Sequence, residues 1–406
     1  MLQTATRSPV TAQAPAAVLP QRLRSLDVFR GATMLFMASE ILHIPAVARR
    51  FPDSTAAGLV AWNLDHVPWV GCAPWDLIQP AFMFMVGVSL PFSVAARRAR
   101  GQAFAPMLGH AAYRALVLIA LGIFLRSLAR AQTYFTFEDV LTQIGLGYVF
   151  LFLLAWTRPR VQWLAAGLIL AGYWLLFAVY PLPPAGFDPA SVGVPADWPH
   201  RLSGFAAHWD KNMNAAHAFD AWFLNLFPRE SPFLFNRGGY LTLNFVPSLA
   251  TMIFGLLAGG LLKERRTARE TLRTLVIFGA AGVVVGFLLH TVGICPIVKR
   301  IWTPSWAIFS AGWVTLILAL VYYAVDVRHP RWAFPFVVVG MNSIAMYVLV
   351  HVATDFVGRS FRIHLGTGVF ELLGPALAPV LLGAATLLVF WLVLFWMYRA
   401  RLFVRI

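Results

Sequence analysis

The sequence has few charged residues. Only 12% of its 406 residues are Asp, Glu, Lys or Arg, whereas 59% are hydrophobic. A soluble domain is about 45–50% apolar and about 25% charged, so this composition excludes an ordinary soluble protein. The apolar residues fall in blocks of about 17–24, long enough to cross the hydrocarbon core of a membrane. Backbone polar groups in lipid must be satisfied within the segment, so these blocks are expected to be helices.

Cysteine and acidic residues are scarce as well. The two cysteines, Cys72 and Cys295, are too few for a disulfide framework. Both fall on the predicted outer side, so a single disulfide between them is an alternative. Lys and Arg number 32 against 17 Asp and Glu, a net charge of +15. A nucleic-acid partner would need this charge gathered on one soluble face. The cations occur instead in short runs between apolar blocks, so no nucleic-acid partner is expected.

The placement of these basic runs predicts the topology. They occur in every second loop, at residues 97–100, 158–160, 263–269 and 399–405, and the positive-inside rule assigns such loops to the cytoplasm. We predict an all-α polytopic membrane protein of about ten transmembrane helices, with the N-terminus and C-terminus cytoplasmic. The spans are expected near residues 28–48, 77–95, 113–128, 140–156, 161–180, 241–262, 272–292, 304–325, 333–354 and 375–398.

The domain organisation is expected to be simple. Residues 1–21 have the composition of a disordered tail and lack the apolar core of a signal peptide. Residues 22–406 form a single transmembrane domain with a long outer loop at 181–240. That loop carries Trp198, Trp209 and Trp222. It is either an interfacial aromatic belt with a capping loop or a platform on which sugar rings stack.

Two residues at the outer end of the first two spans could carry chemistry. His66 has an unperturbed pKa near physiological pH, so it could take a proton from an acceptor amine or hydroxyl, or accept an acyl group itself. The alternative is an interfacial histidine bonded to a carbonyl. Asp76 precedes the second span at an N-cap position, where capping is the first explanation. It could also orient His66 as the third member of a triad does.

Glu40 and His43 are predicted to share a helix face within the first span, three residues apart. A carboxylic acid inside a span is costly and marks a functional site by default; the alternative is a structural buried pair. Glu-x-x-His is also half of a di-iron motif, but no second half is present and no metal is predicted.

Other polar positions lie at the inner end of the first span and in the ninth. Arg24 and Arg30 either form local ion pairs with Asp27 or receive the phosphates of a cytoplasmic nucleotide ligand, since guanidinium matches phosphate geometry. In the ninth span, Asn342 and His351 interrupt an apolar helix. They either face a site in the bundle interior or form hydrogen bonds between helices.

Several short runs resemble the motifs of one family of membrane acyltransferases. They lie in the family's order at residues 22–31 (RLRSLDVFRG), 66–71 (HVPWVG), 75–80 (WDLIQP), 82–87 (FMFMVG), 141–145 (LTQIG), 296–303 (PIVKRIWT), 325–327 (VDV), 340–344 (GMNSI) and 398–403 (YRARLF). The ordered set covers about residues 22–406 and resembles the heparan-α-glucosaminide N-acetyltransferase family.

The resemblance implies a ten-span core that binds acetyl-CoA from the cytoplasm and passes the acetyl group to an amino sugar across the membrane. The family's essential histidine lies in the motif that His66 matches. Lysosomal members acetylate the terminal glucosamine of heparan sulfate. The expected site residues are His66, Asp76 and Glu40 for catalysis, Arg24, Arg30 and Arg98 for acetyl-CoA, and Asn342, His351 and His43 for orientation.

The sequence departs from the family at two places. The Val-Asn pair late in the first span is replaced by Ser39-Glu40-Ile41, so Glu40 could serve as a second base. The Asp-Pro-Glu-Gly run before the sixth span is replaced by residues 236–240 (NRGGY). Both changes touch the acceptor side, so glucosamine cannot be carried over from the family.

The predicted function is transfer of an acetyl group from cytoplasmic acetyl-CoA to an amino-sugar or sugar hydroxyl acceptor on the outer side. The expected partners are the lipid bilayer, acetyl-CoA and a glycan or amino sugar in a bacterial inner membrane, and a homo-oligomer is left open. The alternatives are a proton-coupled secondary transporter, with Glu40 and His43 relaying protons, or a non-catalytic protein of the same fold. The paired, Gly- or Pro-broken spans typical of transporters are not evident.

Overall fold

The computed structural model describes residues 23–404 except 265 and 329, and in this part of the chain it contains helices and no strands. The tail predicted at 1–21 lies outside the described residues. Val70 and Val298 form an isolated antiparallel bridge. The prediction of an all-α chain is confirmed.

Ten long helices and four short ones make up the described chain. The long helices are α1 (Arg24–Ala38), α4 (Ile78–Ala99), α5 (Phe104–Ser127), α6 (Val140–Leu154), α7 (Pro159–Val179), α9 (Phe245–Lys263), α10 (Ala268–Thr291), α11 (Pro304–Tyr322), α13 (Ser343–Leu365) and α14 (Ala378–Arg399). The short helices are α2 (Ile44–Ala48), α3 (Thr55–Asn63), α8 (Ala215–Phe223) and α12 (Phe334–Met341).

Eight helical segments in the described residues are long and apolar enough to cross a membrane, so the chain is a multi-pass membrane protein. Two further apolar helices, Val140–Leu154 and Arg331–Met341, are shorter. The predicted ninth span is wrong in its bounds, because Asn342 interrupts the helix and the long segment begins at Ser343. A count of ten spans and the cytoplasmic position of both termini stay predictions.

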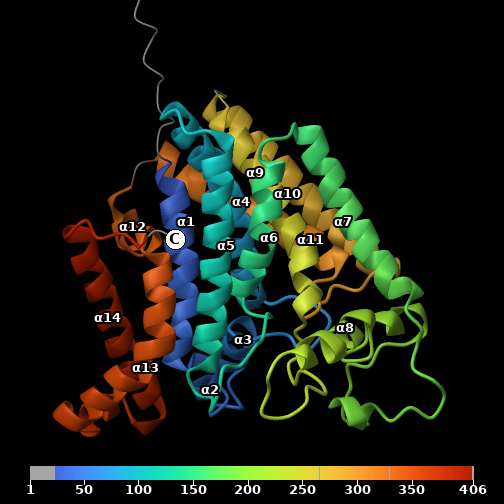
Figure 1. Ribbon diagram of the computed structural model, residues 1–406. Helices are drawn as coiled ribbons and strands as arrows, with labels where there is room; N and C mark the ends of the chain where they lie inside the picture. Colours follow the sequence, from blue (N-terminus) through green and yellow to red (C-terminus); the bar gives the residue numbers. More distant parts are fainter. Residues whose placement is uncertain (1–22, 265, 329, 405–406) are drawn as a thin grey trace, which may run out of the picture.

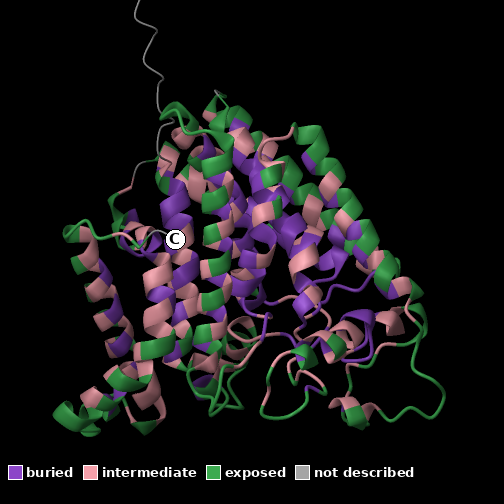
Figure 2. Cartoon of the chain, viewed as in Figure 1, coloured by how far each residue is buried: buried purple, intermediate pink, exposed green. Residues whose placement is uncertain are grey.

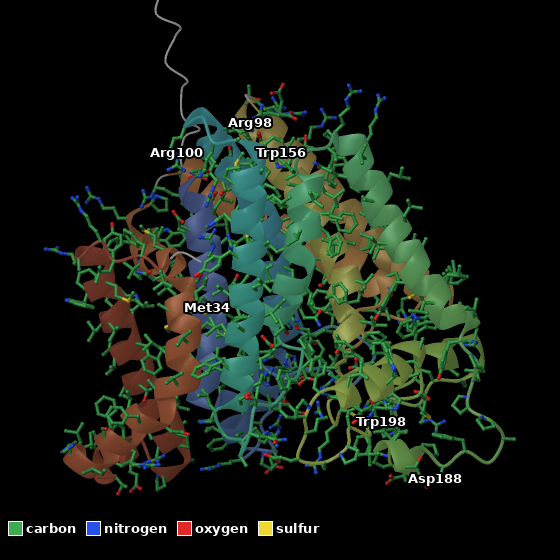
Figure 3. The ribbon with its side chains drawn as sticks, in the orientation of Figure 1. Met34, Arg98, Arg100, Trp156, Asp188 and Trp198 are labelled. Carbon is green, nitrogen blue, oxygen red and sulfur yellow. The ribbon has the colours of Figure 1, made fainter. Side chains whose placement is uncertain are left out.

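The long helices form one bundle with two different ends (Figure 1). The connections α4–α5, α6–α7 and α9–α10, which carry three of the four basic runs, lie at one end, here called the basic end. The opposite end, here called the loop end, holds α2, α3, α8 and the long segment 181–240. Arg98 and Trp156 mark the first, and Asp188 and Trp198 the second (Figure 3). Buried residues run through the middle of the bundle, and the outer helices expose much of their surface (Figure 2).

Glycines bring α4 and α9 into backbone contact. A Cβ at Gly87 would lie 1.9 Å from the carbonyl oxygen of Met252, and one at Gly255 would lie 2.0 Å from that of Phe84. Small residues let membrane helices approach closely and gain van der Waals contact. This contact fixes α4, the helix that begins two residues after Asp76.

Substitution of Gly255 by alanine is expected to destabilise the bundle. The added methyl group would overlap backbone atoms of α4, and overpacking of this kind costs about 1–3 kcal/mol. The melting temperature of the purified protein in detergent measures the effect. Gly109→Ala on α5 is the control, because a Cβ there meets nothing within 4 Å. Equal melting temperatures for the two variants would contradict this account of the α4–α9 contact.

Candidate active site

His66, Asp76 and Lys299 meet at the loop end of the bundle. The His66 Nδ1 atom lies 2.7 Å from Asp76 Oδ1, and Lys299 Nζ lies 3.0 Å from the same nitrogen and 3.4 Å from Asp76 Oδ1. Asp76 and Lys299 are buried, with 0% and 4% of their surface exposed, while 33% of the His66 side chain is exposed. An ionised carboxylate only accepts hydrogen bonds. Lys299 can only donate, so His66 Nδ1 either donates to Asp76 or accepts from Lys299, according to the tautomer. In the tautomer that donates from Nδ1 to Asp76, Nε2 keeps a free lone pair.

Asp76 is held in place by its own turn. It lies in the 3₁₀ turn Pro74–Leu77, and its Oδ2 accepts hydrogen bonds from the backbone N–H groups of Ala73 at 3.0 Å and Val67 at 3.3 Å. One carboxylate oxygen thus caps the turn while the other binds the histidine. The contacts of Asp76 therefore fit both interpretations from the sequence, because one oxygen caps the turn and the other contacts His66.

Lys299 and Arg300 were missed in the sequence, although both lie in the matched run 296–303. They precede α11 on a tight turn held by Thr303, whose hydroxyl donates to the Pro296 carbonyl at 2.7 Å. Arg300 Nη1 donates to the Gly238 carbonyl at 2.8 Å. Its guanidinium lies 5.2 Å from the ring centroid of Tyr240. The signal in the sequence was a lysine–arginine pair in an otherwise apolar motif.

The site keeps His66 neutral and the nearby thiol protonated. Burial lowers the pKa of His66 below its ordinary value; the hydrogen bond to Asp76 opposes this, and the charges of Lys299 and Arg300 lower it further. Burial also raises the pKa of the Cys72 thiol to about 12. Among these groups, neutral His66 is the proton acceptor at neutral pH, and Cys72 is a poor nucleophile because the thiolate is the reactive form.

The loop end contains a second group missed in the sequence. The amide of Asn236 donates to the Glu138 carboxylate, and its oxygen accepts from the backbone of Gly238 and Tyr240. Burial raises the pKa of Glu138 to about 7. The segment 236–240, which departs from the family pattern, therefore connects Glu138 with the Arg300 side chain beside His66.

The long segment 181–240 packs against the loop end of the bundle near His66. Trp69, three residues after His66, donates from its indole nitrogen to the Trp209 carbonyl at 3.1 Å, and its ring contacts that of Trp198 at 5.9 Å. Trp209 is fully buried, whereas 61% of Trp222 is exposed. Two of the three tryptophans thus help to cap the site.

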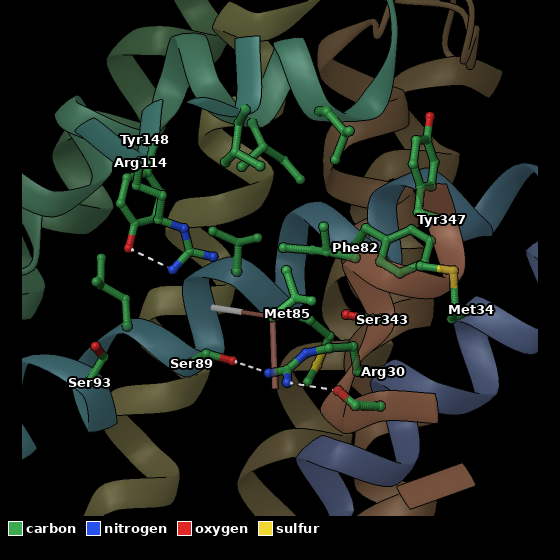
Figure 4. A pocket seen from close by; sticks show the side chains of 18 of the residues that line it. Arg30, Met34, Phe82, Met85, Ser89, Ser93, Arg114, Tyr148, Ser343 and Tyr347 are labelled. Atoms are coloured by element: carbon green, nitrogen blue, oxygen red, sulfur yellow. Dashed lines mark hydrogen bonds between the residues drawn. The ribbon is translucent and has the colours of Figure 1, made fainter. Parts of the chain in front are cut away.

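A cavity of about 460 Å³ lies between α1, α4, α5, α6 and α13. Three arginines line it: Arg30, Arg97 and Arg114. Arg30 donates to the Ser89 hydroxyl at 2.9 Å, and Arg114 donates to the Tyr148 hydroxyl at 3.3 Å (Figure 4). The buried Nε atom of Arg114 has no hydrogen-bond partner. A buried, unpaired guanidinium N–H is unfavourable unless a ligand accepts from it.

This cavity follows α4 from the basic end toward the histidine. Its lining includes Arg97 near the C-terminus of α4 and Phe82 near the N-terminus, a rise of ~22 Å at 1.5 Å per residue. Phe82 is six residues, or ~9 Å of helical rise, from Asp76. A long, flexible ligand with its anionic part at the arginines would therefore extend toward His66.

The structure separates the three arginines predicted to bind acetyl-CoA. Arg30 lines the cavity, but Arg24 and Arg98 do not. Arg24 is exposed at the start of α1, where its backbone N–H donates to Asp326 at 3.0 Å. Arg98 is exposed and lies 5.4 Å from the ring centroid of Trp156. Arg97 and Arg114, which were not predicted, line the cavity with Arg30.

The predicted pairing of Glu40 and His43 on one helix face is wrong. Helix α1 ends at Ala38, Glu40 lies in a 3₁₀ turn, and His43 adopts a left-handed conformation with φ +50°. Pro45 lacks an N–H and its ring would clash with the preceding turn, so the helix cannot continue. Both side chains are exposed. His43 lines a different cavity, of about 320 Å³, together with Asp355.

Asn342 and His351 are not placed beside His66. Asn342 is 1% exposed, donates to the Leu402 carbonyl and accepts from the Val404 N–H, both at 3.0 Å. It thereby holds the C-terminal segment, whose Val404 lines the arginine cavity. The exposed His351 binds the Tyr347 carbonyl within its own helix at 2.9 Å. In the described residues no group of three or more His, Cys, Asp or Glu is arranged to hold a metal.

The fold and the site define a multi-pass helical membrane protein with a partly buried His–Asp–Lys cluster beyond an arginine-lined cavity. The chain is similar to heparan-alpha-glucosaminide N-acetyltransferase of Homo sapiens, with 26% identity over 369 residues, which cover 82% of this chain and 53% of the relative. For the Mus musculus protein of the same name the identity is 24% over 364 residues, 80% of this chain and 53% of the relative. The chain spans about half the length of these curated relatives. No protein-family model matches it. The resemblance noted in the sequence is thus confirmed at low identity.

Proposed function

We propose that this protein transfers the acetyl group of acetyl-CoA to an amino-sugar or sugar hydroxyl acceptor, with His66 as the general base. The observation that carries the proposal is the 2.7 Å contact of His66 Nδ1 with buried Asp76, placed beyond an arginine-lined cavity. The names of the curated relatives, which are N-acetyltransferases, support an acyl-transfer reaction.

The arginine cavity is the proposed site for acetyl-CoA. Its volume of about 460 Å³ falls within the range of about 300–1,000 Å³ typical of small-molecule sites. Arg30, Arg97 and Arg114 would bind the CoA phosphates, because guanidinium groups match phosphate geometry. The pantetheine arm would follow α4 and present the thioester toward His66.

The chemical step uses groups of this chain alone. The acceptor nitrogen or oxygen attacks the thioester carbonyl carbon while His66 Nε2 takes its proton, and Asp76 stabilises the resulting imidazolium. The tetrahedral intermediate then breaks its C–S bond, and the CoA thiolate takes the proton from His66. Direct acetylation of His66 Nε2 followed by transfer is the alternative route, and single-turnover labelling of the protein distinguishes the two.

The proposed direction of transfer follows from the two ends of the bundle. The positive-inside rule places the basic end in the cytoplasm, and Arg97 of the donor cavity lies toward this end. His66 lies at the loop end. Acetyl-CoA would therefore enter from the cytoplasm and the acceptor from the opposite side of a bacterial inner membrane.

Acetyl transfer can be tested on the purified protein in detergent. Labelled acetyl-CoA is supplied with glucosamine as an amine acceptor and with glucose as a hydroxyl acceptor, and the products are analysed by mass spectrometry. We expect an acetylated sugar and free CoA in equal amounts. The absence of acetylated product with every amine and hydroxyl sugar offered would contradict the proposal. A transporter would instead move unmodified solute.

The donor site makes a separate prediction. Arg114→Ala should raise the KM for acetyl-CoA about 10- to 100-fold, because a hydrogen bond to a charged group contributes about 1.5–3 kcal/mol. The kcat should change little, since such a contact is made equally in the ground state and the transition state. Arg98→Ala is the matched control, because Arg98 lies on Trp156 outside the cavity. A KM raised equally in both variants would contradict the placement of the donor.

A further inference from the structure

A second large cavity lies away from His66, between the outer helices α7 and α10. Its volume is about 850 Å³, and its walls come from α7, α9, α10 and α11. Apolar and small side chains dominate the lining, among them Trp163, Phe254, Phe278 and Gly260. The donor, acceptor and histidine of the proposed reaction do not use this cavity, here called the lateral cleft.

The cleft exists because its two outer helices pack on different partners. α10 packs closely along α11, where a Cβ at Gly312 would lie 2.5 Å from the Val283 backbone nitrogen. α7 packs along α9 instead. The Trp163 ring crosses the gap, with centroids 5.9 Å from the ring of Phe278 and 5.7 Å from that of Phe254.

The cleft opens toward lipid rather than toward water. α7 and α10 belong to segments apolar enough to span a membrane. Three apolar side chains of the lining are exposed to about half of their surface: Trp163 by 46%, Phe278 by 53% and Val285 by 45%. A lipid-facing surface of this kind is filled by hydrocarbon, since lipid tails are as apolar as the side chains.

The mouth of the cleft carries charged groups at the basic end. Lys263, the last residue of α9, lines it together with Glu264 and Arg266. Arg266 binds Glu264 through Nε at 2.6 Å and also lines an adjoining cavity with Arg273. The charges of the mouth sum to a positive value, at the level where lipid headgroups lie beside the ends of spanning helices.

We propose that the lateral cleft binds one phospholipid with an anionic headgroup, taken from the leaflet at the basic end. An acyl chain would lie between α7 and α10, and the phosphate would contact Lys263 and Arg266. Cations near a membrane surface attract anionic lipids with about 1 kcal/mol each. This site does not depend on the proposed acetyl transfer.

Gly260 gives a direct way to fill the cleft. A Cβ at Gly260 would meet nothing within 4 Å, and the residue lies one turn before the mouth. Gly260→Leu places a side chain in the space for the lipid, and leucine is a better helix former than glycine. Gly172→Leu on α7 is the matched control, because a Cβ there also meets nothing within 4 Å and Gly172 does not line the cleft.

Native mass spectrometry of the full chain in detergent, titrated with phosphatidylglycerol or phosphatidylcholine, tests the site. We expect one phosphatidylglycerol bound about tenfold more tightly than phosphatidylcholine, from the charges at the mouth. Gly260→Leu should weaken phosphatidylglycerol binding at least about tenfold, because overpacking of the occupied cleft costs about 1–3 kcal/mol, and Gly172→Leu should not. The double variant Lys263→Ala, Arg266→Ala should remove the preference for phosphatidylglycerol, whereas Arg100→Ala, Arg399→Ala should keep it. Equal affinity of the wild type for both lipids, or unchanged binding by Gly260→Leu, would overturn the proposal.

Discussion

Replacement of His66 by alanine is expected to lower the kcat for acetyl transfer by about 10²–10⁴-fold, the usual contribution of a general base. In the proposed reaction Nδ1 donates to Asp76, 2.7 Å away, and Nε2 takes the proton of the attacking amine or hydroxyl. The KM for acetyl-CoA should change little, since the cavity arginines are untouched. Steady-state kinetics with saturating acceptor measure both constants.

Cys72→Ala is the control for this variant. The thiol lies in the same site and is held protonated by burial, so it should not act as the nucleophile and its loss should leave most of the activity. Full activity in His66→Ala, or a loss in Cys72→Ala as large as that in His66→Ala, would remove the catalytic assignment.

Replacement of Lys299 by methionine is expected to change the pH profile of kcat/KM. The acidic limb of that profile reports protonation of the free enzyme's base. Burial, Lys299 and Arg300 lower the pKa of His66. In the wild type, His66 therefore stays neutral down to a pH below the ordinary pKa of histidine. Without the ammonium group 3.0 Å away, the imidazolium is favoured, the pKa of His66 rises and the limb moves to higher pH. Each 1.36 kcal/mol of repulsion that is lost between Lys299 and the imidazolium raises the pKa of His66 by about one unit. On the acidic limb, each such unit lowers kcat/KM about tenfold.

Lys299→Arg distinguishes a charge effect from a structural one. Arginine keeps the positive charge beside Asp76, so its acidic limb should lie close to that of the wild type. The activity of Lys299→Met should recover at alkaline pH, where His66 is neutral again. A loss of equal size at every pH, with no movement of the limb, would contradict the assigned role of Lys299.

Composition was sufficient to predict the helices, and the spacing of the basic runs predicted that three of the four lie at one end of the bundle. The break at Asn342 was not predicted, since a single polar residue within an apolar span can also form a hydrogen bond to a neighbouring helix without ending its own. Asn342 is instead used to hold the chain near Leu402 by two hydrogen bonds. The prediction for Glu40 and His43 assumed one helix through residue 48, whereas α1 ends at Ala38 and His43 has a φ of +50°.

The candidate site was predicted in part. His66 and Asp76 lie ten residues apart, and their motif brings them together. Lys299 reaches the same nitrogen from 233 residues away, and no local pattern shows which distant turn packs there. The same limit explains why Arg97 and Arg114, which line the cavity, were not among the predicted residues. Helix ends are rich in arginine, and only the packing of α4 against its neighbours shows which side chains turn inward.

The most direct test of the central claim uses sealed vesicles in which the purified protein has one known orientation. Labelled acetyl-CoA is supplied at the basic end alone and an amino-sugar acceptor at the loop end alone. We predict labelled acetyl-sugar in the acceptor compartment, CoA in the donor compartment, and loss of both in vesicles that contain His66→Ala. Product that forms only when donor and acceptor share one compartment, or that forms equally with His66→Ala, would contradict the account.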